Sequence, residues 1–146
     1  MLKKQKKLFI GALLLSALSI CGLHPTAASA AISQENAVSV CSVNTASSSA
    51  SLSISNSGSA VVSARVIGKA GTEKIQMTVK LQKYDSKTGN WKAVKTWEKT
   101  KMSSILSVEY NYSLSARGTY RCKMTASVVK AGKSETVSLT SDKKKY

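Results

Sequence analysis

The sequence predicts an all-β protein, an antiparallel sandwich of about seven strands. Two stretches carry this prediction, residues 118–129 and residues 73–84, because in both of them apolar and polar residues alternate strictly. Alternation with a period of two is typical of a strand that has one face in a core and one in water. Turn residues separate the alternating stretches, and residues 31–146 contain no stretch with the period of a helix.

The first thirty residues have the pattern of a secretory signal peptide. Four lysines precede an apolar run over residues 8–23, and small residues at Ala28 and Ala30 follow it. This order predicts cleavage after Ala30. An uncleaved membrane anchor is the alternative, although the run is short for a bilayer span. A lipid anchor on Cys21 is disfavoured because Ile20, which precedes it, is not small.

Cleavage leaves a chain of one-domain size, and we expect three parts in it. Residues 31–46 form a polar lead-in that is either an edge strand or an ordered tail. Residues 47–141 form the sandwich, and residues 142–146 form a basic C-terminal tail.

The expected strands follow one another with turn residues between them. In chain order they lie within residues 46–59, 60–67, 73–84, 91–99, 105–114, 118–129 and 134–140. The third has the longest alternation and should be central in its sheet. In the fourth, the alternation places Trp91, Ala93 and Trp97 on one side and Val94 on the other.

A turn at Gly118 leads into Tyr120, which lies two positions before Cys122. This pattern resembles the F strand of an immunoglobulin-like sandwich, and the second half of the chain resembles strands C to G of an immunoglobulin-like or fibronectin type III-like domain. The resemblance implies a tyrosine corner, in which the Tyr120 hydroxyl bonds to backbone of the preceding connection. Residues 47–141 also resemble small, uncharacterised, secreted β-sandwich proteins of Gram-positive bacteria.

The chain departs from the antibody-like pattern at its cysteines and at its core tryptophan. The stretch that corresponds to strand B, residues 60–67, has no cysteine, and the strand C position expected to hold Trp falls at Met77 and Val79. Cys41 and Cys122 remain after cleavage. An oxidising destination permits a disulfide between them, and two free thiols are the alternative.

The charge of the chain points to an anionic partner. Removal of four signal-peptide lysines leaves 18 of the 22 Lys and Arg residues against all seven acidic residues, a formal charge of +11. Such an excess favours association with polyanions and says nothing about the fold. Outside a cell these polyanions include cell-wall teichoic acids, acidic glycans and phospholipid head groups.

Residue types that catalysis needs are scarce. The single histidine, His24, lies in the signal peptide, so the mature chain lacks the general base of Ser-His-Asp and Cys-His sites. The sequence also lacks a cysteine or histidine spacing typical of zinc sites, a closely spaced carboxylate pair and a Gly-rich phosphate loop. We therefore expect a protein without enzymatic activity, metal or cofactor.

Two surfaces are candidates for binding. The first is the outward face of two strands that are neighbours in immunoglobulin-like sandwiches, with Lys74, Lys80, Arg121 and Lys123. Outward lysines also serve solubility alone. The second is an edge with Trp91 and Trp97, which suit a sugar ring or a protein partner. Alternatively, these tryptophans cover the sheet edge or pair with Tyr84.

The sequence thus predicts a secreted, non-enzymatic binding module that is associated with the cell wall and binds an anionic polymer, a glycan or a protein. A secreted cationic antagonist, bacteriocin-like or an inhibitor, is the alternative. Membrane damage requires an exposed apolar element, whereas the alternation here is used in building a core.

Overall fold

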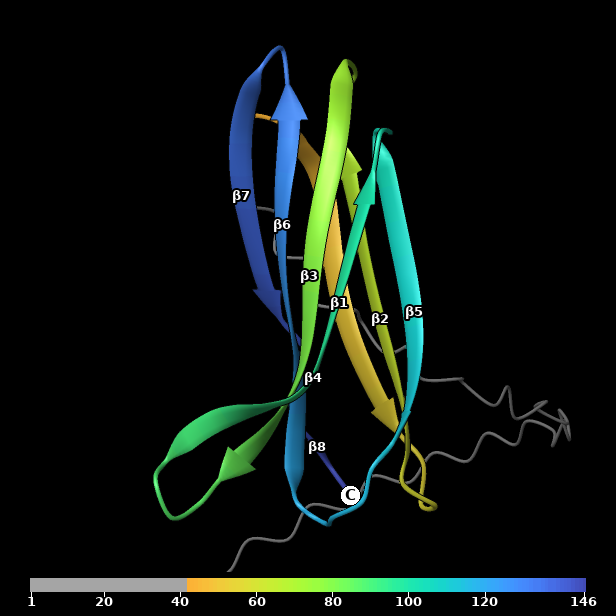
Figure 1. Ribbon diagram of the computed structural model, residues 1–146, viewed down its shortest axis with the longest axis vertical. Coiled ribbons are helices and arrows are strands. Elements are labelled where there is room, and N and C mark those ends of the chain that lie inside the picture. Colours follow the sequence, from red (N-terminus) through yellow and green to blue (C-terminus); the bar gives the residue numbers. More distant parts are fainter. Residues whose placement is uncertain (1–41) are drawn as a thin grey trace, which may run out of the picture. The chain divides into compact units, whose positions relative to one another are not determined.

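The computed structural model describes residues 42–146, and these residues form two antiparallel β-sheets (Figure 1). The strands are β1 (Thr45–Ile54), β2 (Ser59–Gly68), β3 (Thr72–Asp85), β4 (Asn90–Lys101), β5 (Ile105–Ser113), β6 (Thr119–Lys130), β7 (Lys133–Thr140) and β8 (Lys144–Lys145). The predicted all-β fold is confirmed. The predictions for the signal peptide, the cleavage after Ala30 and residues 31–41 of the lead-in lie outside the described residues.

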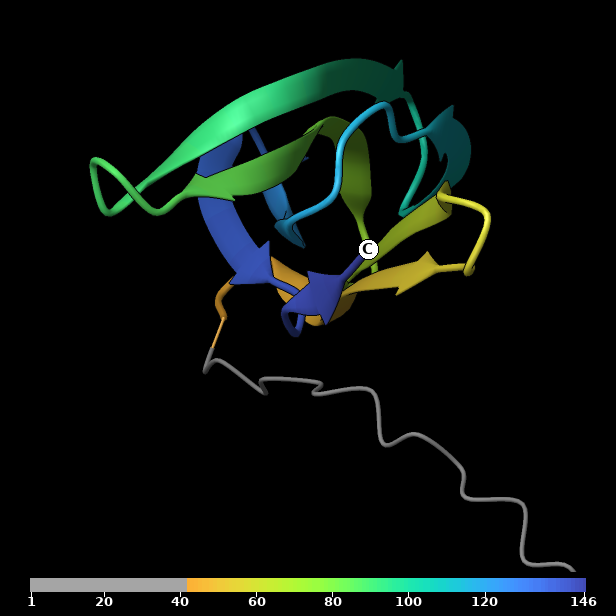
Figure 2. The same cartoon turned by 90° about the horizontal axis from the view of Figure 1, so that it is seen from below.

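The two sheets form the layers seen in Figure 2. One sheet has the strand order β1-β2-β5 and the other has the order β4-β3-β6-β7, with the short β8 paired to β6. β3 lies between β4 and β6, so the prediction that it is a central strand is confirmed. Short turns connect most neighbours, as in β-hairpins.

The core lies between the layers because the inward residues of the alternating strands are apolar. Buried residues come from both sheets, and among the fully buried ones are Val62, Val66, Ile75, Met77, Val79, Leu81, Tyr120, Cys122, Met124 and Val128. Burial of a Val, Leu, Ile or Met side chain contributes about 1.5–3 kcal/mol. Met77 and Val79, at which the resemblance would have placed a tryptophan, are both buried in this core.

The hairpin of β3 and β4 extends beyond the two layers (Figures 1 and 2). Its register shifts between Leu81 and Gln82, which pair with Lys95 and Ala93, and Val94 is therefore the extra residue of a β-bulge. A bulge bends the strand that carries it and increases its twist. Beyond the bulge, the inner face of the hairpin has left the apolar core and carries charged residues.

A carboxylate from β7 holds the entry of the chain into β1. Glu135 accepts hydrogen bonds from the backbone N–H groups of Val43, Asn44 and Thr45 at 2.8, 2.7 and 3.0 Å. Partial burial raises the pKa of Glu135, but hydrogen bonds from the Ser42 side chain, from the N–H groups of Asn44 and Val43 and from the Thr45 side chain outweigh burial and lower the pKa to about 2.

The opposite end of β6 contains the predicted tyrosine-corner contact. Tyr120 is buried, and its hydroxyl donates a hydrogen bond of 2.5 Å to the carbonyl oxygen of Ala116, four residues earlier. This prediction is confirmed. Burial raises the pKa of the Tyr120 hydroxyl. The C-terminal tail is tied down at the same end, because β8 pairs with β6 and Tyr146 exchanges backbone hydrogen bonds with Gly118.

Candidate anion-binding site

The four predicted cations all lie on the outer face of the β4-β3-β6-β7 sheet. Lys80 and Lys123 are direct partners across β3 and β6. Arg121 precedes Lys123 by two residues on β6 and therefore lies on the same side of the strand. Lys80 is exposed, whereas Lys123 and Arg121 are half-buried. These three residues form a cluster, which we call the outer cluster.

Arg121 is held in place by its neighbours. Its guanidinium lies 4.1 Å from the centre of the Trp91 ring, and its Nε donates a 2.9 Å hydrogen bond to Gln82. A guanidinium stacked on an aromatic face keeps donors at its edge.

Lys74 lies apart from the outer cluster. It occupies β3 six residues before Lys80, next to a register shift between Thr72 and Lys74. Six residues of a strand span about 20 Å. Exposed charges are screened over about 8 Å at physiological salt, so Lys74 does not act together with the other three.

The two tryptophans lie on opposite faces of β4, and the prediction that they share one side is wrong. Trp97 pairs with the buried Val79, whereas Trp91 pairs with the outward Tyr84. The bulge at Val94 reverses the alternation between them. A single contact surface that uses both rings is therefore not formed.

Each tryptophan has aromatic neighbours. The ring of Trp91 lies 5.3 Å from that of Tyr84, which is the cross-strand pairing considered from the sequence. Trp97 stacks on Tyr110 of β5 with ring centres 4.7 Å apart and meets Tyr112 edge-on at 6.3 Å. Trp97 therefore joins the two sheets along their β4–β5 edge.

A pocket of about 490 Å³ opens where the β3–β4 hairpin faces the connection from β5 to β6. Four cationic side chains and one carboxylate line it: Lys83, Lys87, Lys92, Arg117 and Asp85. Their formal charge is +3. Tyr84 lies between Lys83 and Asp85 in this lining, but its ring is on the outward face of β3 against Trp91.

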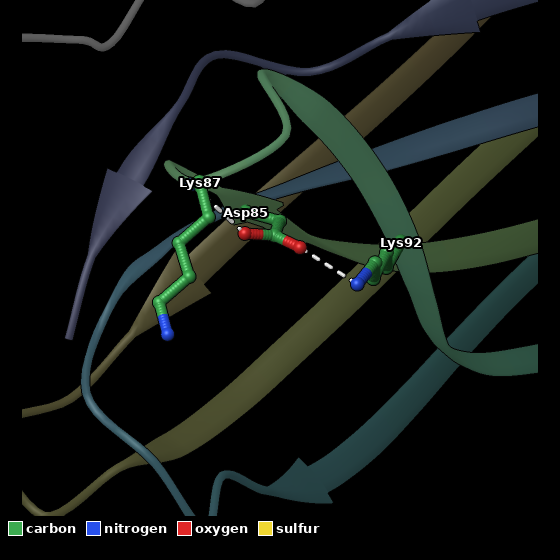
Figure 3. A network of polar contacts seen from close by, with 3 residues as sticks. All are labelled: Asp85, Lys87 and Lys92. Atoms are coloured by element: carbon green, nitrogen blue, oxygen red, sulfur yellow. Dashed lines mark hydrogen bonds and ion pairs between the residues drawn. The ribbon is translucent and has the colours of Figure 1, made fainter.

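Asp85 organises one side of this pocket (Figure 3). Its carboxylate pairs with Lys92 Nζ at 2.6 Å and accepts a 3.0 Å hydrogen bond from the backbone N–H of Lys87. The bond with Lys92 and the bond with Lys87 lower the pKa of Asp85 to about 2. Figure 3 shows that the ammonium group of Lys87 points away from the carboxylate.

Lys83 forms the floor of the pocket on the other side. It is the direct cross-strand partner of both Lys92 and Tyr120, and its ammonium group lies 5.8 Å from the centre of the Tyr120 ring. The stem of Lys83 crosses Gly118 so closely that a Cβ there would lie 2.5 Å from Lys83 Cε. A larger residue at position 118 would displace the end of the Lys83 side chain, so glycine at this position leaves room for it.

Alternation within single strands does not predict this pocket. Its cations come from β3, a turn, β4 and a connection about thirty residues further on, and none of them belongs to a recognisable motif. The signal in the sequence is the break in apolar alternation after Leu81, where Lys83 and Asp85 take inward positions.

Cys122 carries a free thiol that is fully buried, and burial raises its pKa to about 12. Cys41 lies outside the described residues, so the disulfide stays a prediction.

Within residues 42–146, no three His, Cys, Asp or Glu side chains are grouped as metal ligands would be. The same part of the chain has no helix that is long and apolar enough to cross a membrane.

Comparison with known proteins adds no family to this description. No family model matches the chain, and no curated protein matches its sequence.

Proposed function

We propose that this chain is a secreted, non-enzymatic binding module that attaches to an anionic polymer of the cell surface. The observation that carries the proposal is the excess of cations in the folded part. Since four of the 22 basic residues and Glu35 precede residue 42, the described residues hold 18 Lys and Arg against six acidic residues, a formal charge of +12. Such a charge attracts polyanions and speeds their encounter.

The arrangement of the acids supports the proposal. Glu135 is engaged by backbone N–H groups at the start of β1, and Asp85 is paired with Lys92. Neither of these two acids compensates the outer cluster, and Glu98 is the acidic residue that β4 places on the same face, opposite Thr78. Three neighbouring cations act together on a polymer although each exposed pair contributes only about 0–1 kcal/mol.

We also propose that the sandwich is immunoglobulin-like or fibronectin type III-like. The neighbouring positions of β3, β6 and β7 and the hydroxyl bond of Tyr120 to Ala116 support this assignment. The assignment concerns the scaffold, because one fold carries many functions.

Retention of the folded protein on immobilised anionic wall polymer tests the function. We expect retention at physiological salt, and it should fall steeply as the salt concentration rises. Replacement of Lys80, Arg121 and Lys123 by Gln should weaken retention more than the same change at Arg65, Lys99 and Lys101, which carry the same total charge. Equal losses would assign the attraction to net charge, and no retention of the unaltered protein would refute the proposal.

A further inference from the structure

The pocket at the hairpin end concentrates positive charge that the fold itself does not need. Lys83 and Lys92 are direct partners across β3 and β4, and like charges directly opposite each other destabilise a sheet. Lys87 and Arg117 add two more cations. Of the four cationic groups, only that of Lys92 forms an ion pair with Asp85. A bound anion would relieve this repulsion.

Contacts within the fold hold three of the four donors of the pocket, Lys83, Lys92 and Arg117, before a ligand arrives. Asp85 holds Lys92 and fixes the turn at Lys87, and Gly118 leaves room for the stem of Lys83. Arg117 has its guanidinium carbon 4.4 Å from the centre of the Tyr146 ring, and this cation–π contact occupies none of its N–H groups with an acceptor oxygen. Donors that are ordered in advance reduce the entropy lost on binding.

The directions of these donors select the chemistry of the ligand. They come from four segments around one cavity, whereas a carboxylate has two oxygens in one plane. A phosphate monoester has three acceptor oxygens and a charge of about −1.5 to −2, which matches a formal pocket charge of +3. Arg and Lys are both common phosphate-binding residues.

The size of the pocket indicates that the ligand is larger than a phosphate ion and includes the group to which the phosphate is attached. A volume of about 490 Å³ is within the range of small-molecule sites and exceeds the needs of a phosphate ion. Ser86 also lines the pocket, and its hydroxyl can form a hydrogen bond with a hydroxyl of a sugar or polyol.

We propose that this pocket binds the phosphate ester of a sugar or polyol, as a terminal or pendant unit of the anionic polymer. This proposal rests on the proposed function, because the anionic polymer is the source of the ligand. It differs from that function in requiring a saturable site with one ligand per chain, separate from the outer cluster.

Calorimetric titration with glycerol 3-phosphate at about 0.15 M salt tests the site, with glycerol and acetate as reference ligands. We expect 1:1 saturable binding of the phosphate ester and none of the reference ligands. The double variant Lys83→Met and Arg117→Gln should bind about tenfold or more weakly, because hydrogen bonds to charged groups are strong. Methionine keeps the apolar stem that crosses Gly118.

The matched control is the double variant Arg65→Gln and Lys99→Met, which loses the same charge from exposed strand positions away from the pocket. It should bind glycerol 3-phosphate as the unaltered protein does. Lys87→Gln alters an exposed turn residue whose ammonium group makes no hydrogen bond or ion pair within residues 42–146, so this variant should fold, and it should weaken binding even if the pocket double variant unfolds.

The outcomes separate this inference from the proposed function. Polymer retention without saturable binding of glycerol 3-phosphate overturns the pocket and keeps the function. Saturable binding without polymer retention keeps the pocket and refutes attachment to the polymer. Equal weakening by the pocket and control variants, or equal binding of acetate, overturns the pocket as a phosphate site.

Discussion

The two ends of β6 use carboxylates in opposite ways. Where β6 ends, Glu135 lies among backbone N–H groups of residues 43–45, and its charge is matched by donors of the fold. Where β6 begins, Asp85 lies among four cations and leaves a formal excess of +3. The first arrangement stabilises the entry of the chain. The second leaves positive charge for a ligand, so the same residue chemistry serves structure at one end and binding at the other.

Replacement of Glu135 by Gln should give the largest loss of stability. Asn44 and Thr45 are buried, and their N–H groups lose a charged acceptor. We expect a decrease of about 2 kcal/mol in the free energy of unfolding, measured by urea denaturation at neutral pH. Glu109→Gln is the control, because Glu109 is exposed and accepts one hydrogen bond from Ser63 at 3.3 Å.

The contribution of Glu135 should also depend on pH. Its pKa is lowered from 4.5 to about 2 on folding, so its stabilisation is complete above pH 4.5 and is lost as the pH falls towards 2. The difference in unfolding free energy between the unaltered protein and Glu135→Gln should therefore shrink over this interval. A difference that stays constant would show that the N–H contacts do not depend on the charge.

Tyr120→Phe tests the end at which β6 begins and should cost about 1 kcal/mol. The substitution leaves the core ring in place and removes the donor to Ala116. Tyr84→Phe serves as control because Tyr84 is partly exposed on the hairpin. An unfolding midpoint of Tyr120→Phe equal to that of the control would contradict the tyrosine corner.

Asp85→Asn should have the smallest effect on stability. Asp85 bonds to Lys92 and to the Lys87 N–H in a solvent-accessible turn region, and asparagine can still accept from that N–H. The unfolding midpoint should move much less than in Glu135→Gln. A loss as large as that of Glu135→Gln would mean that both ends of β6 use their carboxylate for the fold.

Much of the fold could be predicted because the strands are half-buried and alternate strictly. Residues 73–84 and 118–129 correspond to β3 and β6 to within a few residues, and the hydroxyl bond of Tyr120 followed from the resemblance. β8 could not be predicted, because its residues Lys144 and Lys145 follow Lys143 and show no alternation of apolar and polar residues. The pairing that orders them comes from β6.

The candidate site was less accessible to prediction. The bulge at Val94 reverses the faces of β4, and its only trace in the sequence is the adjacent apolar pair Ala93 and Val94. The outer cluster followed from alternation, but the separation of Lys74 depends on its place along β3. The pocket depends on how a bent hairpin meets a distant connection, which alternation does not encode.

The most direct test of the account is a titration of the isotopically labelled protein with glycerol 3-phosphate, followed through its backbone amide resonances at about 0.15 M salt. We predict saturable shifts in residues 83–92 and 117–119 and unchanged resonances in residues 43–45 and 128–135. Shifts of similar size at both ends of β6, or no saturable shift at the hairpin end, would contradict the division between a structural end and a binding end.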